Sequence, residues 1–189
     1  INETTEEAFN LLENLLRWTR NQNGKTKIYA TLFNLTPVAR QVVSLFSAIA
    51  NAKEIELINR IEGKFDIFAD EDMIKTVLRN LISNAIKFTY TGGQVELSLA
   101  DSGDYWTIYV KDNGKGIPKD LQAHLLKSDE YITTYGTHNE KGSGLGLILC
   151  RDFIRMNKGK LHFCSQEGIG TTFYFTIPKA SSSAEAVSR

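Results

Sequence analysis

Two asparagines and a lysine recur on one side of a predicted helix. Asn80, Asn84 and Lys87 stand at positions i, i+4 and i+7, so they share one helical face. The other face of the same segment is apolar and is formed by Ile74, Val77, Leu78, Leu81, Ile82 and Ala85. Amide oxygens suit Mg²⁺, and a lysine ammonium suits phosphate. The helix is therefore expected to bury one side and to present metal- and phosphate-compatible groups on the other.

A carboxylate precedes two spaced glycines in the run 112–118. Asp112 could accept a hydrogen bond from the exocyclic amine of a base. Gly114 and Gly116 would let the backbone come close to a flat ring. Because alternating apolar residues at 95–99 and 106–110 predict a hairpin, Asp112 is expected at the end of a strand, where a loop can meet a ligand.

Two further glycine-rich runs follow. Gly142, Gly144 and Gly146 lead into an apolar helical segment, and glycines at a helix N-terminus form a typical phosphate cradle. The run 168–173 turns into a final strand. Each motif is weak alone, and the run 142–146 lacks both the preceding strand of a dinucleotide fold and the Gly-Lys-Ser/Thr ending of a P-loop.

The order and spacing of these four motifs resemble the N, G1, G2 and G3 boxes of the ATP-binding catalytic domain of sensor histidine kinases. That domain belongs to a larger family with gyrase-type and mismatch-repair ATPases, and the resemblance covers nearly the whole chain. It implies a protein-histidine kinase that uses ATP and Mg²⁺ in two-component signalling. The implied partners are a phosphoacceptor histidine helix outside this chain, a response regulator receiver domain and a second copy in a full-length homodimer. Residues 136–147 also resemble those of hybrid kinases, which implies a hybrid kinase parent.

The resemblance also implies roles for individual residues. Asn84 would coordinate Mg²⁺, Asn80 would assist at the phosphates, and Lys87 would neutralise developing charge. Asp112 would hold the adenine amine and Thr171 would brace it, directly or through a water. The ring would be lined by Gly114, Gly116 and Ile117. Backbone N–H groups of Gly142, Gly144 and Gly146 would contact the phosphates, Lys141 would be a contact from the lid, and Leu145 would also bind the nucleotide.

One position separates two types of reaction. Gyrase-type ATPases carry a glutamate where Asn80 stands, and that glutamate activates water. An amide cannot take a proton at neutral pH, so Asn80 argues for transfer to a nucleophile with its own basicity, such as imidazole. Two alternatives stay open: an ATP-gated switch, either a pseudokinase or a clamp, and a serine kinase of the anti-sigma type. A bundle-like helix at residues 1–23 favours the histidine kinase.

Composition limits the remaining possibilities. The chain has 189 residues, 42% of them hydrophobic, and a formal net charge of +0, so neither a nucleic-acid groove nor a polybasic membrane patch is indicated. No apolar run approaches about 18 residues, so we expect a cytoplasmic fragment without direct membrane contact, whose parent could be anchored in the inner membrane. Cys150 and Cys164 lack metal spacing and are expected to be reduced thiols.

The predicted fold is α+β, a two-layer sandwich with a mixed sheet covered by three helices and preceded by a bundle-type helix. Residues 1–24 resemble the second helix of a dimerisation and phosphoacceptor hairpin, 25–179 the catalytic domain, and 180–189 a disordered tail or linker. A helix is expected over 37–52, with Thr36 as N-cap and with core positions Val38, Val42, Leu45, Phe46 and Ile49. Asp70 should cap a helix over 71–89, and the polar loop 127–141 should be the ATP lid.

Overall fold

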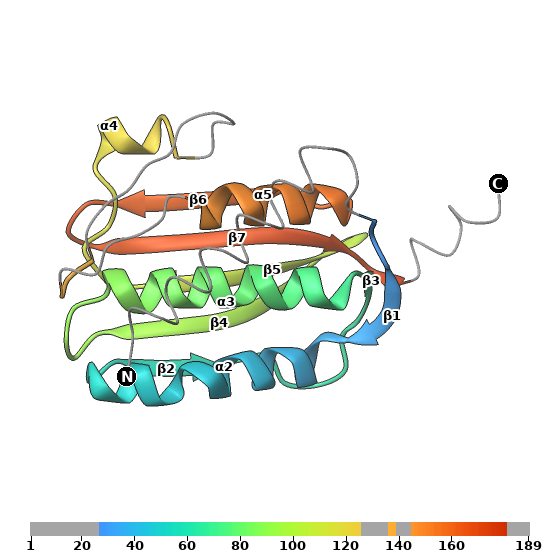
Figure 1. The fold of residues 1–189 in the computed structure, drawn as a ribbon, viewed down its shortest axis with the longest axis horizontal. Coiled ribbons are helices and arrows are strands. Elements are labelled where there is room, and N and C mark those ends of the chain that lie inside the picture. Colours follow the sequence, from blue (N-terminus) through green and yellow to red (C-terminus); the bar gives the residue numbers. More distant parts are fainter. Residues whose placement is uncertain (1–26, 126–135, 139–144, 181–189) are drawn as a thin grey trace.

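The computed structural model describes residues 27–125, 136–138 and 145–180, and within these a mixed five-stranded sheet carries helices on one face (Figure 1). The strand order is β2-β4-β5-β7-β6, with β2 parallel to β4 and the other pairs antiparallel. The strands are β2 (Glu56–Asn59), β4 (Gln94–Ser102), β5 (Tyr105–Asp112), β6 (Leu161–Gln166) and β7 (Gly170–Pro178). The covering helices are α2 (Leu35–Ala52), α3 (Glu71–Phe88) and α5 (Gly146–Met156). The predicted two-layer α+β sandwich is confirmed.

Two smaller features complete the fold. Strands β1 (Thr31–Asn34) and β3 (Asp66–Ala69) form a separate antiparallel pair, and the short helix α4 (Lys119–Gln122) lies at the far end of the domain (Figure 1). The predicted helix over 1–23 lies outside the described residues, as do most of the predicted lid and of the tail. No helix among the described residues is long and apolar enough to cross a membrane.

Helix α3 is the central helix of the covering layer, and it forms as the sequence predicts. Asp70 is its N-cap, and the carboxylate accepts a hydrogen bond from the Met73 N–H at 3.1 Å. The apolar face packs on β4 and β5 between α2 and α5, and its fully buried residues are Ile74, Val77, Leu78, Leu81 and Ile82. Because this face is fixed by burial, the opposite face with Asn80 and Asn84 must point away from the core.

Helix α2 departs from the prediction in two respects. Its N-cap is Asn34, whose side chain accepts from the Thr36 N–H, while the Thr36 hydroxyl donates to the Gly63 carbonyl. Leu45 and Ile49 were expected in the core, yet they are 58% and 56% exposed. The reason is position: α2 is the outermost helix over the edge strand β2, so only the side toward α3 and the sheet is covered (Figure 1).

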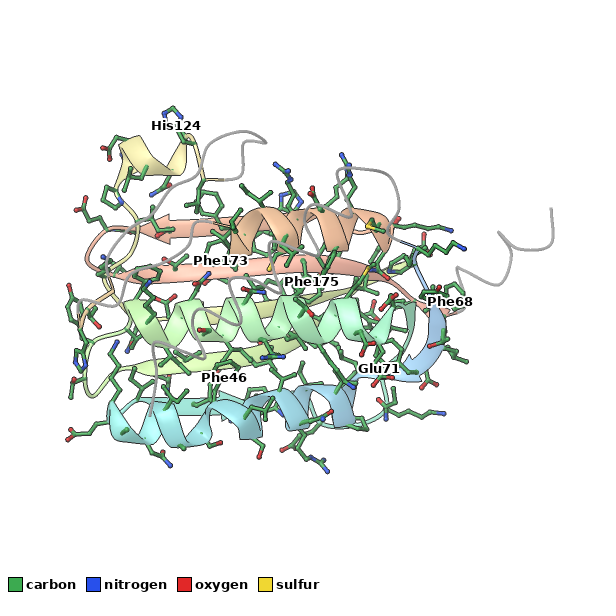
Figure 2. All side chains as sticks on the ribbon, in the orientation of Figure 1. Phe46, Phe68, Glu71, His124, Phe173 and Phe175 are labelled. Atoms are coloured by element: carbon green, nitrogen blue, oxygen red, sulfur yellow. The ribbon has the colours of Figure 1, made fainter. Side chains whose placement is uncertain are left out.

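The sheet brings two distant segments together at one end. Along β5 and β7, inward-facing residues are buried, and Phe173 and Phe175 pack in the core between sheet and helices (Figure 2). In the antiparallel register of these strands, Asp112 at the end of β5 lies opposite Thr171 at the start of β7. The two predicted residues are therefore neighbours, although 59 positions separate them.

Candidate functional site

A cavity of about 540 Å³ opens between α3, the loop that follows β5, the start of α5 and the β6–β7 turn. This volume suits a small-molecule ligand. The predicted residues among its walls are Asn80, Asn84, Lys87, Asp112, Gly116, Ile117, Gly146 and Thr171. Gly114 and Leu145 are described but do not line the cavity, whereas Lys141, Gly142 and Gly144 fall outside the described residues. Residues of three predicted motifs, together with Gly146 from the run 142–146, thus line one cavity.

One end of the cavity offers amide oxygens and helix N–H groups. Asn80 donates its side-chain N–H to the Thr76 carbonyl at 2.9 Å, which fixes the orientation of the amide. Its Oδ1 faces α5, because a Cβ added at Gly146 would lie 2.8 Å from that oxygen. The side chain of Asn84 makes no hydrogen bond to any described residue, so its amide remains available to a ligand. With the N-terminal amides of α5 beside them, these groups fit a magnesium-bound phosphate.

The other end of the cavity is organised by the Asp112 carboxylate. Its Oδ1 accepts from the Gly114 N–H at 2.9 Å and from the Thr171 N–H at 3.2 Å. Its Oδ2 has no hydrogen-bond partner among the described residues, although the side chain lines the cavity. Burial raises the pKa of Asp112 to about 6, against the lowering effect of the two backbone N–H groups. At neutral pH the cavity therefore contains a buried, ionised acceptor with one oxygen left for a ligand.

Thr171 contacts Asp112 through its main-chain amide, whose N–H donates to the carboxylate. Its hydroxyl is instead 2.9 Å from the Ser165 hydroxyl. Ser165 also accepts from the Ile117 N–H at 2.9 Å, so it connects β6 to the loop after β5. Nothing in the sequence marked Ser165, because its partners lie in other segments of the chain.

The glycines of the loop after β5 allow close contacts between backbones. Gly116 has φ of +67°, and a Cβ there would lie 2.0 Å from the Gln166 carbonyl oxygen. A Cβ at Gly114 would lie 2.1 Å from the Phe88 carbonyl oxygen. The expected reason for these glycines was approach to a ligand ring. The structure shows that they also let this loop sit between the end of α3 and the β6–β7 turn.

Several lining residues were missed by the sequence analysis. Phe88 has the Lys87 ammonium 5.3 Å and the Lys115 ammonium 5.0 Å from its ring centroid, so two cations flank one aromatic wall. Glu167 adds an exposed carboxylate from the β6–β7 turn, which packs on Gly116 at the Asp112 end. The other lining residues without a predicted ligand contact are Ala85, Tyr90, Pro118, Leu121, Leu125, Leu147, Gly168 and Phe173, of which Pro118, Gly168 and Phe173 lie within the predicted motifs 112–118 and 168–173. Their residue types alone do not distinguish them from core or surface positions.

Comparison with known proteins agrees with this geometry. The model of the histidine kinase-, DNA gyrase B- and HSP90-like ATPase family matches residues 69–181, which include every predicted site residue. The chain belongs to this ATPase family. The catalytic domain of the histidine kinase ThkA, solved in a nucleotide-free form, has a TM-score of 0.68 and 31% identity, over 80% of this chain and 96% of that one. The expected histidine-kinase type of ATP-binding domain is confirmed.

Two relatives extend well beyond the part that this chain matches. The adaptive-response sensory kinase SasA of Crocosphaera subtropica is 30% identical over 170 residues, which cover 89% of this chain and 44% of that protein. ThkA in complex with the response regulator protein TrrA matches with a TM-score of 0.68 and 26% identity, over 96% of this chain and 53% of that one. The chain thus spans less than half of its curated relative SasA.

Proposed function

We propose that this domain binds Mg-ATP in the 540 Å³ cavity and supports transfer of the γ-phosphoryl group to a histidine on a helix outside the described residues. The observation that carries the proposal is that one cavity joins Asp112 to Asn80 and Asn84. Family membership supports the use of ATP, and the relatives named as histidine kinases support the class of acceptor.

The two ends of the cavity would bind different parts of the nucleotide. Asp112 Oδ2 would accept from the adenine amine, since Oδ1 is already used by two backbone N–H groups. Asn84 would hold Mg²⁺, while Asn80 and the N-terminal amides of α5 face the phosphates. Lys87 would place a positive charge beside them. When bound, Mg²⁺ supplies charge neutralisation between phosphate oxygens, and positioning by the protein accounts for the rest of the catalysis.

Transfer is favoured over hydrolysis by the residue at position 80. The Asn80 amide cannot remove a proton from water. The two carboxylates that line the described part of the cavity belong to its other end, where Asp112 is bound by backbone N–H groups and Glu167 lies on the β6–β7 turn. A histidine acceptor brings its own basic nitrogen and needs no such residue.

Partners of the full-length protein follow from the same proposal. A solved relative, ThkA, is found in complex with the response regulator protein TrrA, which supports a receiver domain as the next acceptor. The acceptor helix would belong to the same or a paired kinase, and we propose a homodimer for the full-length protein.

The test supplies the acceptor separately. The domain is mixed with γ-labelled ATP, Mg²⁺ and a helical hairpin that presents a histidine of the kind histidine kinases phosphorylate. Acid-labile label on the hairpin supports the proposal, and acid-stable label indicates a serine kinase. Binding of ATP without any transfer indicates an ATP-gated switch. Asn84→Ala should abolish transfer, whereas Ser83→Ala, an exposed neighbour on the same helix that does not line the cavity, should leave it unchanged.

A further inference from the structure

The main-chain carbonyl of Lys87 is a meeting point of three donors at the end of α3. It accepts from the Lys53 ammonium at 2.9 Å, from the Thr137 N–H at 3.0 Å and from the Thr137 hydroxyl at 3.2 Å. Helix α3 ends one residue later, at Phe88, so this oxygen is one of the carbonyls without a partner inside the helix. The Lys87 side chain lines the cavity, so these contacts fix the backbone from which it projects.

Lys53 is a buried lysine outside the cavity. It follows the last turn of α2, is 6% exposed, and also donates to the Ile86 carbonyl at 3.0 Å. Figure 1 shows the C-terminal ends of α2 and α3 at the same side of the helical layer. Burial of an ammonium is unfavourable unless hydrogen bonds compensate, and the carbonyl end of a helix carries partial negative charge. Lys53 therefore holds the end of α3 by hydrogen bonds to main-chain oxygens. Its burial is unusual, because most lysines in proteins are exposed.

The segment 136–138 is attached to the same place. The Thr137 hydroxyl lies 2.8 Å from the Thr89 carbonyl oxygen in addition to its contact with Lys87. His138 Nε2 lies 3.2 Å from the Thr91 hydroxyl. This segment belongs to the chain between Leu125 and Gly146, both of which line the cavity. One short anchor thus joins residues 136–138 to the end of α3.

We propose that Lys53 and Thr137 are positioning residues for the phosphate-binding part of the site. Neither lines the cavity. They act through their shared acceptor, the Lys87 carbonyl, and so hold the backbone from which the Lys87 side chain reaches the cavity. This inference rests on the proposed function of ATP binding. The loop that carries Asp112 touches the end of α3, since the Lys115 N–H donates to the Phe88 carbonyl at 3.0 Å. The Asp112 carboxylate itself is held by the N–H groups of Gly114 and Thr171, so phosphates should depend on the anchor more than the base does.

The test compares ATP with adenosine in two single variants and their combination. Lys53→Met keeps the buried stem but removes the ammonium, and Thr137→Val removes the hydroxyl but keeps the N–H. Each variant should bind Mg-ATP about tenfold more weakly, while adenosine affinity changes less than about twofold. Because both variants remove a donor to the same Lys87 carbonyl, the double variant should lose less ATP affinity than the product of the two single effects. Lys75→Met serves as control, since Lys75 pairs with Glu71 at the opposite end of α3.

Hydrogen exchange provides a second measurement that needs no nucleotide. Amides of 136–138 should exchange about tenfold faster in Lys53→Met than in the wild type, because the shared acceptor is no longer fixed. Equal losses of ATP and adenosine affinity, unchanged exchange at 136–138 or strictly multiplicative single effects would overturn the inference. If Lys53→Met fails to fold, Thr137→Val is the deciding variant, because Thr137 is only half-buried. A wild-type domain that binds no ATP would instead refute the proposed function, and the exchange measurement would still decide on the anchor.

Discussion

Replacement of Asp112 by asparagine should weaken ATP binding and stabilise the empty domain at the same time. The carbonyl of the introduced amide could keep the two hydrogen bonds from Gly114 and Thr171, which would leave its Nδ2 amine at the position of Oδ2. An amine in that place would face the adenine amine, so two hydrogen-bond donors would oppose each other. In the wild type, the charged carboxylate accepts the hydrogen bond that the adenine amine donates. Loss of a hydrogen bond to a charged group costs about 1.5–3 kcal/mol, which is roughly 10- to 150-fold in affinity. A 6-oxo purine presents an acceptor at this position, so ITP should be weakened less than ATP.

The gain in stability follows from the raised pKa. Asp112 has a pKa of about 6 in the folded domain instead of 3.8. Above pH 6 the carboxylate is ionised in both states, and its burial costs up to about 3 kcal/mol, or about 1–2 kcal/mol after allowance for its remaining solvent contact. Below pH 3.8 it is protonated in both states, so this cost disappears. The free energy of unfolding of the variant should therefore exceed that of the wild type at pH 8, and the difference should shrink as the pH falls through 6.

Urea unfolding at pH 8, 6 and 4 measures the stability difference, and calorimetric titration with ATP and ITP measures binding. Wild-type affinity for ATP should fall as the pH drops below about 6, whereas the variant should show only the titration of the nucleotide itself. A folded variant that binds ATP as tightly as the wild type refutes the assigned base contact. A stability difference that stays constant from pH 8 to 4 refutes the argument from the buried charge.

Three further predictions concern metal binding, backbone packing and the edge helix. Asn84→Ala should weaken Mg-ATP about tenfold or more but leave metal-free ATP binding nearly unchanged, as titrations with Mg²⁺ and with EDTA would show. Gly116→Ala should lower the free energy of unfolding by about 2 kcal/mol or more in urea, because the added Cβ meets the Gln166 carbonyl oxygen and the backbone has positive φ. Leu45→Gln should change stability by less than about 0.5 kcal/mol, whereas Leu78→Ala should cost about 2–5 kcal/mol, and similar losses for both would contradict the exposure of Leu45.

The sequence predicted the parts of the site that depend on local pattern. Helix α3 follows from its apolar period and from Asp70 as N-cap, and the position of Asp112 follows from the alternation along its hairpin. Leu45 and Ile49 were placed in the core wrongly, because helical period does not reveal that α2 lies at the edge of the helical layer. The anchor at Lys53 was missed for a related reason. Its acceptors lie 33 and 34 residues away, and a buried lysine has the same sequence signature as an exposed one.

Two buried charged residues of opposite sign, Asp112 and Lys53, are each held by hydrogen bonds to main-chain groups. Asp112 is held by backbone N–H groups and keeps one oxygen for a ligand, whereas Lys53 donates to backbone carbonyls and does not line the cavity. Each would be easier to stabilise as an uncharged residue, so their presence is better explained by the geometry they impose than by stability. In the proposed site, the base-binding carboxylate is held at the start of β7, and the backbone of Lys87 is held at the end of α3. Because different hydrogen bonds hold the Asp112 carboxylate and the Lys87 backbone, we expect substitution of Lys53 to weaken binding of the phosphates more than selection of the base.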